Sequence, residues 1–166
     1  MPSRAIWKRK ENCSRLAEKV ISQVNLEAEQ IDQLLVSYAA LLTRVQKNTP
    51  DLVEVTAVAS VLHSFYNGLE NIFLAIAKGV DADVPTGSQW HRDLLIRMTE
   101  STASRGPVLT TGLAHRLMDY LGFRHFYRHS YSFFLEWEEL ERLVTPLAEV
   151  WAQVKSELQL FLDSLN

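Results

Sequence analysis

Two long segments of the chain repeat apolar residues at the spacing of an amphipathic helix. Residues three or four apart fall on one side of a helix, so each stripe must be buried against another element. In residues 14–46 the stripe consists of Leu16, Val20, Val24, Ile31, Leu34, Leu35, Tyr38, Leu41, Leu42 and Val45. In residues 51–78 it consists of Val55, Val58, Leu62, Phe65, Leu69, Ile72, Phe73 and Ile76. We therefore expect two long helices that pack on one another.

Signals for a helix start and a helix stop surround the second stripe. Thr49 is the predicted N-cap, because Pro50 follows it and proline suits the first helical position. Asp51 and Glu54 then lie in the opening turn, where the helix dipole favours anions. Gly79 is the predicted C-terminal stop of this helix.

The rest of the chain predicts shorter helices between two loops. Residues 79–89 and 101–107 are rich in turn-forming residues and are expected to be loops. Helices are expected near residues 90–99 and over residues 111–133. A last helix contains Pro146, which either kinks it or opens its second part.

Composition supports an all-α fold. Only six glycines and five prolines occur in 166 residues, and no segment alternates apolar and polar residues as a strand does. The length suits one domain over residues 1–166, in which residues 1–13 are expected to form a flexible N-terminal segment. The fold class that we predict is an antiparallel bundle of four to five helices.

Charge and cysteine content exclude several classes of protein. Seventeen Lys and Arg against 20 Asp and Glu give a net charge of −3, so any nucleic-acid site must be a local patch. A single cysteine, Cys13, excludes an internal disulfide and a multi-cysteine zinc site. The sequence shows neither a secretory signal nor a long apolar run, so we expect a cytoplasmic protein with no membrane contact.

The familiar catalytic motifs are absent. None of the five histidines follows a glutamate by three residues, which argues against a di-iron helical bundle. His-Glu-x-x-His, a Walker loop and Gly-x-Ser-x-Gly do not occur either. These absences exclude the commonest hydrolases and nucleotide enzymes that such motifs identify.

Residues 123–131 combine arginine, histidine and aromatic side chains. At about 100° per residue, a helix here places its polar groups within one broad face and most aromatic groups on the opposite one. We expect the polar face to point outward or toward a partner, and it consists of Arg124, His125, Arg128, His129 and Tyr131. We expect the other face to pack in the core, and it consists of Phe123, Phe126, Tyr127, Ser130, Phe133 and Phe134.

An arginine and histidine cluster has the chemistry for cutting RNA. Arginine donates a fork of hydrogen bonds to phosphate, and histidine gives or takes protons near neutral pH. RNA can be cut without a metal when its 2′-hydroxyl attacks the neighbouring phosphate, and DNA lacks that group. Two other interpretations stay open at this point. A solvated Arg/His surface has the same pattern, and a zinc site could use His125 and His129 but lacks a third ligand.

The run Arg124-His125-Phe-Tyr-Arg-His129-Ser-Tyr131 resembles the Arg-x4-6-His motif of HEPN-domain ribonucleases, in the form seen in HepT-like toxins. The segment from His63 to Phe73 looks like an earlier helix of the same group. So does the run Pro85-x-Gly87-x-x-Trp90-His91-Arg92-Asp93-Leu94-Leu95. The resemblance covers most of the chain from about residue 14.

This resemblance implies a five-helix bundle that forms a homodimer, with the motifs of both protomers meeting in a cleft. It implies a metal-independent endoribonuclease, often a toxin, that needs no cofactor. Carried over to this sequence, Arg124 binds phosphate and stabilises the transition state, His129 is the general acid or base, and His125 orients them. We assign Arg128 to the RNA backbone.

The resemblance also implies a partner protein. The antitoxin of this family is a minimal nucleotidyltransferase that adds AMP to the motif tyrosine, which corresponds to Tyr131. An adenylate there would place bulk and negative charge in the RNA cleft. This chain departs from many members by having His125 where they have asparagine, so the assignment of acid and base between His125 and His129 stays open.

Two competing interpretations belong to other classes. One is a catalytically silent HEPN bundle that binds a partner protein or a nucleotide through the Arg/His face. The other is a structural bundle whose Arg/His residues are only solvated. Outside the motif, we expect Glu70 and Asn71 to be polar bundle residues, and Trp90 and His91 to cap or pack a helix.

Overall fold

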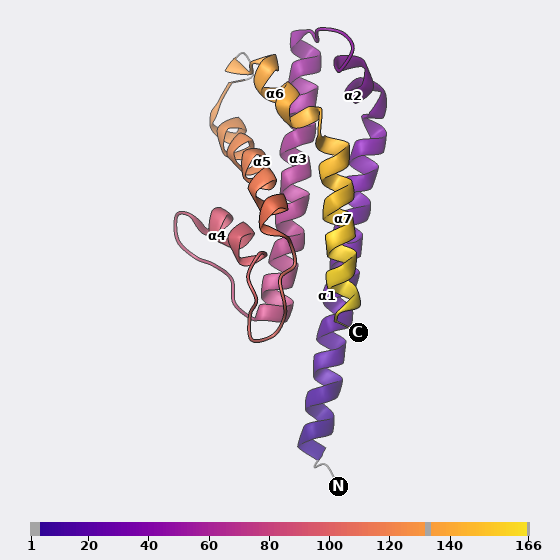
Figure 1. Cartoon of the computed structure of the whole chain (residues 1–166), viewed down its shortest axis with the longest axis vertical. Helices are drawn as coiled ribbons and strands as arrows, with labels where there is room; N and C mark the ends of the chain where they lie inside the picture. The colour runs from indigo at the N-terminus through magenta and orange to yellow at the C-terminus, as the bar shows by residue number, and fades with distance from the viewer. Residues whose placement is uncertain (1–3, 132–133, 166) are drawn as a thin grey trace.

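The computed structural model describes residues 4–131 and 134–165 and contains no strand in these ranges. Figure 1 shows the chain running up through α1, down through α3, up through α5 and down through α7. This arrangement confirms the prediction of an all-α helical bundle. Its elements are α1 (Arg4–Ser37), α2 (Ala39–Val45), α3 (Leu52–Ile76), the π-helical turn η1 (Ala77–Asp81), α4 (Trp90–Arg97), α5 (Thr111–His129), α6 (Trp137–Val144) and α7 (Leu147–Asp163).

Helix α3 is the centre of the bundle. It packs against α1 on one side and α5 on the other, and it also contacts α4 and α6. Its apolar side chains are buried on several faces because a helix surrounded by others has little surface for solvent. Within the described part of the chain, none of the helices has the length and apolar character needed to span a membrane.

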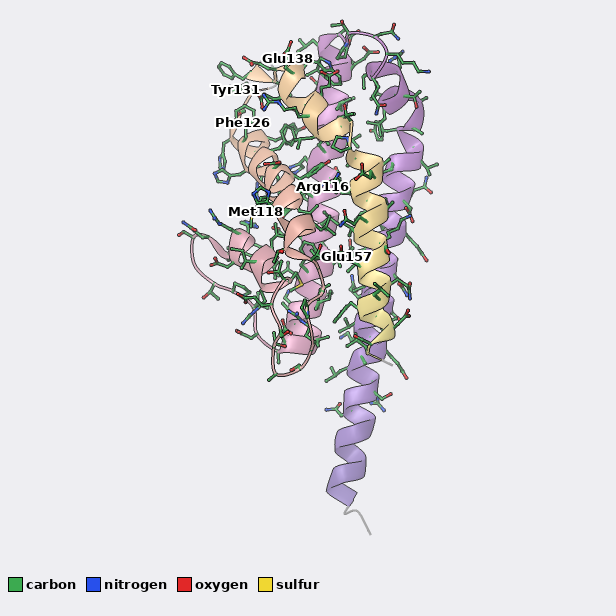
Figure 2. All side chains as sticks on the ribbon, in the orientation of Figure 1. Arg116, Met118, Phe126, Tyr131, Glu138 and Glu157 are labelled. Atoms are coloured by element: carbon green, nitrogen blue, oxygen red, sulfur yellow. The ribbon has the colours of Figure 1, made fainter. Side chains whose placement is uncertain are left out.

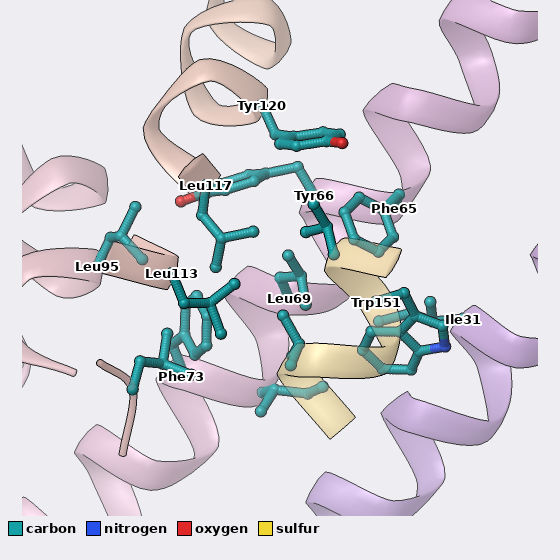
Figure 3. Packing of buried hydrophobic residues seen from close by; sticks show 14 of the residues in the cluster. Ile31, Phe65, Tyr66, Leu69, Phe73, Leu95, Leu113, Leu117, Tyr120 and Trp151 are labelled. Atoms are coloured by element: carbon teal, nitrogen blue, oxygen red, sulfur yellow. The ribbon is translucent and has the colours of Figure 1, made fainter. Parts of the chain in front are cut away.

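Aromatic side chains from three helices meet in the core (Figure 3). The ring of Phe65 on α3 lies edge-on to Tyr120 of α5 and to Trp151 of α7, with centroid distances of 5.4 and 6.0 Å. Trp151 also donates from its indole nitrogen to Asp32 Oδ1 of α1, at 2.7 Å. These contacts hold α5 and α7 in place around α3, which sets the position of the C-terminal half of α5.

The start of α3 differs from the prediction. Asp51, not Thr49, is the N-cap: its side chain accepts from the backbone N–H of Glu54 at 2.8 Å. The Glu54 side chain in turn accepts from the backbone N–H of Asp51 at 3.0 Å. This reciprocal pair satisfies two backbone donors at once, which a threonine two residues earlier cannot do.

The first predicted helix is divided in two. Helix α1 ends at Ser37, α2 starts at Ala39, and Tyr38 between them leaves the helical conformation with φ −106° and ψ 10°. The Ser37 hydroxyl donates to the carbonyl of Gln33 at 2.7 Å. Side-chain bonds of this kind compete with the backbone ladder and bend helices.

Gly79 has a packing role rather than a stopping role. Helix α3 ends at Ile76, and Gly79 lies inside η1. A Cβ atom at this position would overlap Cγ2 of Val20 on α1. Glycine is therefore required here because the backbone of η1 comes close to α1.

The C-terminal elements settle the other expected helix boundaries. Helix α5 ends at His129, earlier than predicted, because Ser130 is extended with φ −116° and ψ 151°. Residues 132 and 133 of that predicted helix lie outside the described residues. Pro146 opens α7, so the second of its two expected roles is the correct one.

The loop between α4 and α5 is held by a buried ion pair. Arg105 donates from Nε and Nη2 to the two carboxylate oxygens of Asp81, at 2.8 and 2.7 Å. Its remaining donors reach the carbonyls of Glu100, Gly106 and Arg97. A buried charge is tolerated when it is paired and fully hydrogen-bonded. The pair connects this loop to η1 and so orients α4 and α5 against α3.

Candidate functional site

Arg124 is buried, with 7% of its surface exposed, so the prediction that it lies on an outward face is wrong. Its Nε donates to Asn67 Oδ1 at 2.6 Å, and its Nη2 donates to Glu70 Oε1 at 3.0 Å. Both partners lie on α3. The physical reason for the difference is that a guanidinium enters a bundle when a carboxylate and an amide there replace its water.

Glu70 uses its second oxygen to hold His91 of α4. Its Oε2 lies 2.5 Å from His91 Nδ1, while its Oε1 pairs with Arg124. The His91 ring stacks on Trp90 with centroids 3.7 Å apart and an angle of 29°. Trp90 and His91 therefore pack together as expected, but His91 also joins a polar network. One carboxylate connects α3, α4 and α5.

Asn67 extends this network to His63. Its oxygen accepts from Arg124, so its amide nitrogen faces His63 Nε2 at 3.0 Å and donates to it. The other ring nitrogen of His63, Nδ1, is buried and has no hydrogen-bond partner in the described part of the chain. The His63 ring also packs on Tyr127, with centroids 4.9 Å apart.

The environment of His63 favours its neutral form. Burial lowers the pKa of the imidazole, and the positive charges of Arg124 and Arg128 lower it further. The hydrogen bond from Asn67 acts in the same direction because it occupies Nε2 as an acceptor. We define His63, Asn67, Glu70, His91 and Arg124 as the buried polar network.

The other predicted site residues of α5 are exposed to solvent. His125, Arg128 and His129 all lie on the surface. The rings of His125 and His129 come together, with centroids 5.0 Å apart and an interplanar angle of 58°. Arg124 and His129 are five residues apart, about 140° around the helix, so Arg124 faces α3 while His129 faces outward. The structure brings the two histidines together on the surface and directs Arg124 toward α3.

His129 and Tyr131 line a surface groove of about 630 Å³ next to the start of α6. Figure 2 shows Phe126 and Tyr131 at the C-terminal end of α5, near this groove. Tyr131 is 72% exposed. The groove is lined by Phe126, His129, Ser130, Tyr131, Phe134, Glu136 and Glu139.

The expected aromatic core face of α5 is only partly buried. Phe123 is buried and Tyr127 is half-buried, but Phe126 is 45% exposed and Phe134 is 59% exposed. Phe133 lies outside the described residues. The prediction fails for Phe126 because Arg124 occupies the side that faces α3, which turns Phe126 toward solvent. Phe134 lies beyond the end of α5 and does not follow its helical periodicity.

A metal site finds no support in the described ranges. Among the side chains that the structure describes, no three from His, Cys, Asp and Glu are placed to share a metal ion. His125 and His129 lie close to each other but have no third ligand in this part of the chain.

Sequence reasoning missed three functional candidates on α3. His63, Asn67 and Glu70 occupy positions i, i+4 and i+7, which fall on one side of a helix. Polar residues at that spacing in an otherwise apolar helix are the signal that could have identified them. Asn71, the neighbour of Glu70, points elsewhere and donates to Glu27 Oε2 of α1 at 3.3 Å.

Comparison with known proteins identifies the family. The family model described as HepT-like protein matches residues 57–165, which include most of α3 and all of α4 to α7. No curated protein and no solved structure matches significantly. The matched segment contains the whole buried polar network and the groove around Tyr131. Because the family model covers well over half of the sequence, this chain belongs to the HepT-like family.

Proposed function

We propose that this chain is a metal-independent endoribonuclease and the toxin of a toxin–antitoxin pair. Membership in the HepT-like family supports a toxin role. The observation that carries the proposal is the combination of a firmly held guanidinium, that of Arg124, with two exposed histidines whose rings are in contact. These are His125 and His129, which follow Arg124 in the sequence by one and five residues. These are the groups that an RNA phosphate and its transferred protons require.

The proposed reaction is an internal transfer at phosphorus. The 2′-oxygen of RNA forms a bond to phosphorus and its proton passes to one histidine. The bond from phosphorus to the 5′-oxygen breaks, and the other histidine gives that oxygen a proton. Arg124 stabilises the negative charge that builds on the phosphoryl oxygens. The products are a 2′,3′-cyclic phosphate and a 5′-hydroxyl, and no metal or cofactor takes part.

The proposed active unit is a homodimer. Within one chain Arg124 and His129 face different directions, so a second copy is needed to complete a cleft that contains both. Exposed Phe126 and Phe134 supply apolar surface beside His129, as protein interfaces commonly do. Arg128 is exposed on the same part of α5 and contacts the RNA backbone in this proposal.

The proposed antitoxin is a minimal nucleotidyltransferase that transfers AMP to Tyr131. The phenol oxygen attacks the α-phosphorus of ATP, and pyrophosphate leaves. Tyr131 is 72% exposed and lines the groove with His129, so an enzyme can reach it. The adenylate would add a negative charge and fill the groove, which excludes RNA from the same place. In this proposal both proteins act in the cytoplasm.

The test is cleavage of total cellular RNA by purified wild type and by His129→Ala, each in EDTA. Light scattering on the same samples gives the dimeric state. We expect wild type to cut RNA and to leave cyclic phosphate ends, and we expect His129→Ala to lose cleavage while keeping its fold. Absence of cleavage by an unmodified, dimeric wild type would overturn the proposal in favour of a silent bundle that binds a partner.

A further inference from the structure

One side of α3 presents polar side chains to Arg124. Asn67 and Glu70 each accept one hydrogen bond from the guanidinium, and they approach it at different nitrogens, Nε and Nη2. Two bonds from two residues on a rigid helix define both the position and the plane of the group. The side chain is therefore held in one orientation before any RNA arrives.

We propose that Asn67, Glu70 and His91 are positioning residues that orient Arg124 toward the RNA phosphate. This inference rests on the ribonuclease function proposed above. It assigns a role to three side chains that lie outside the α5 motif. Asn67 and Glu70 are on α3, and His91 is on α4. None of the three is placed in contact with RNA; each acts through Arg124.

The network leaves one part of the guanidinium available. Nη1 of Arg124 has no hydrogen bond to any described residue, whereas Nε and Nη2 are both occupied. In this proposal a phosphoryl oxygen accepts from Nη1, the guanidinium nitrogen that Asn67 and Glu70 leave without a bond.

His91 prevents Glu70 from turning away. The carboxylate is 8% exposed and its Oε2 lies 2.5 Å from His91 Nδ1, so both oxygens are committed to partners on different helices. The stacking of Trp90 on His91 limits the movement of the imidazole in turn. A carboxylate held at both oxygens keeps a constant distance to Arg124 during turnover.

Glu70 also reduces the net charge that RNA meets. Its carboxylate neutralises the guanidinium at 3.0 Å, so the pair offers RNA directed donors with little net attraction. Replacing the carboxylate by an amide of the same shape removes the negative charge and loosens the hold on Arg124. The two effects act on different kinetic constants. Loss of the negative charge lowers KM because RNA binds more tightly, and the looser hold on Arg124 lowers kcat because the chemical step slows. If Glu70 only supported the fold, its replacement would reduce the fraction of active protein, which lowers the apparent kcat and leaves KM unchanged.

The experiment measures kcat and KM of four full-length variants on the RNA segment that wild type cuts in total cellular RNA. The variants are Glu70→Gln, Asn67→Ala, Arg124→Ala and the control Asn71→Ala, whose side chain lies one position from Glu70 but contacts α1. We expect Glu70→Gln to lower kcat by about 10-fold to 100-fold, the range that misplacement of a catalytic group costs, and to lower KM as well. We expect Asn67→Ala to lower kcat similarly and Asn71→Ala to stay within about twofold of wild type.

A second measurement does not depend on cleavage. The Nε–H of Arg124 is bonded to Asn67, so its NMR signal should exchange slowly with water in wild type and in Asn71→Ala. We expect fast exchange in Asn67→Ala. Unchanged exchange in Asn67→Ala would overturn the positioning role, because the guanidinium would then be held by other groups.

The kinetic outcomes separate this inference from the proposed function. If Arg124→Ala is inactive while Glu70→Gln and Asn67→Ala cut like wild type, positioning is refuted and the ribonuclease stands. If Arg124→Ala cuts like wild type, or wild type cuts no RNA, the proposed function fails and the positioning role fails with it. If kcat and KM respond as stated, both stand.

Discussion

Nη2 of Arg124 lies 3.0 Å from Oε1 of Glu70, in an ion pair buried between α5 and α3. Each of the two side chains is 8% exposed. Taking two charges out of water is unfavourable, and their attraction offsets this only while both are present. The pair therefore connects the stability of the bundle to the placement of its candidate catalytic arginine.

Removing Glu70 should destabilise the fold strongly. Glu70→Ala leaves the Arg124 charge buried without its counterion, so we expect the free energy of unfolding to fall by about 3–5 kcal/mol. Urea denaturation measures the change. The control is Glu139→Ala, which breaks an exposed pair with Arg142 and should change stability by about 0.5 kcal/mol or less. Equal effects at the two positions would contradict the buried pair.

Two glycine substitutions should have opposite signs. Gly79→Ala places a Cβ against Val20, and we expect it to destabilise the protein by about 1–3 kcal/mol through overpacking. Gly122→Ala, inside α5, meets nothing within 4 Å. It should stabilise the protein by about 0.5–1 kcal/mol, because alanine has the higher helix propensity. Thermal unfolding of both variants checks these signs against wild type. A Gly79→Ala protein as stable as wild type would rule out the close approach of η1 to α1.

His63 should make stability depend on pH. Burial and the charges of Arg124 and Arg128 lower its pKa below the value of 6.5 expected for the unfolded chain. The unfolded state thus binds this proton at higher pH than the folded state, so the stabilisation is complete above pH 6.5 and is lost as the pH falls toward the folded pKa. Urea denaturation across this pH range should show that the free energy of unfolding falls more steeply with falling pH for wild type than for His63→Gln. Identical declines would mean that His63 does not contribute.

Tyr131→Phe should leave RNA cleavage intact and prevent the proposed modification by AMP. The variant keeps the ring and loses the hydroxyl that we propose as the AMP acceptor, so we expect RNA cleavage to persist and modification by the proposed nucleotidyltransferase to stop. Intact-protein mass spectrometry after incubation with the antitoxin and ATP detects the added AMP. Full modification of Tyr131→Phe would show that another residue is the acceptor.

A mixture of two inactive variants should recover activity. If Arg124 of one protomer works with His129 of its partner, a heterodimer of Arg124→Ala and His129→Ala contains one intact site. After subunit exchange in an equal mixture, about a quarter of wild-type activity is expected, because half of the dimers have one site of two. No recovery in a mixture shown to exchange would indicate that each site uses one chain alone.

The sequence predicted the helices well and the burial of Arg124 poorly. Apolar periodicity is a local property, so the stripe from Val55 to Ile76 identified α3 without knowledge of its neighbours. The side of α5 on which Arg124 lies depends on Glu70, which is 54 residues earlier in the chain. Helical spacing cannot show that partner, and a polar face drawn as wide as about 160° joins groups that point in different directions.

The α3 residues were predictable in part. Glu70 was expected to be a polar bundle residue, and its place in the core agrees with that. What the sequence does not contain is the geometry that makes Oε1 serve Arg124 while Oε2 serves His91. That arrangement exists only once α3, α4 and α5 have packed together.

The shared carboxylate of Glu70 also has a consequence for how this sequence can vary. A change at Glu70 leaves two partners unsatisfied, on two other helices, so no single compensating substitution restores the site. Related sequences that keep the arginine should therefore keep the carboxylate, and those that lose one should lose the other. Correlated loss of Asn67, Glu70, His91 and Arg124 would then mark the descendants in which the bundle has been retained for binding alone.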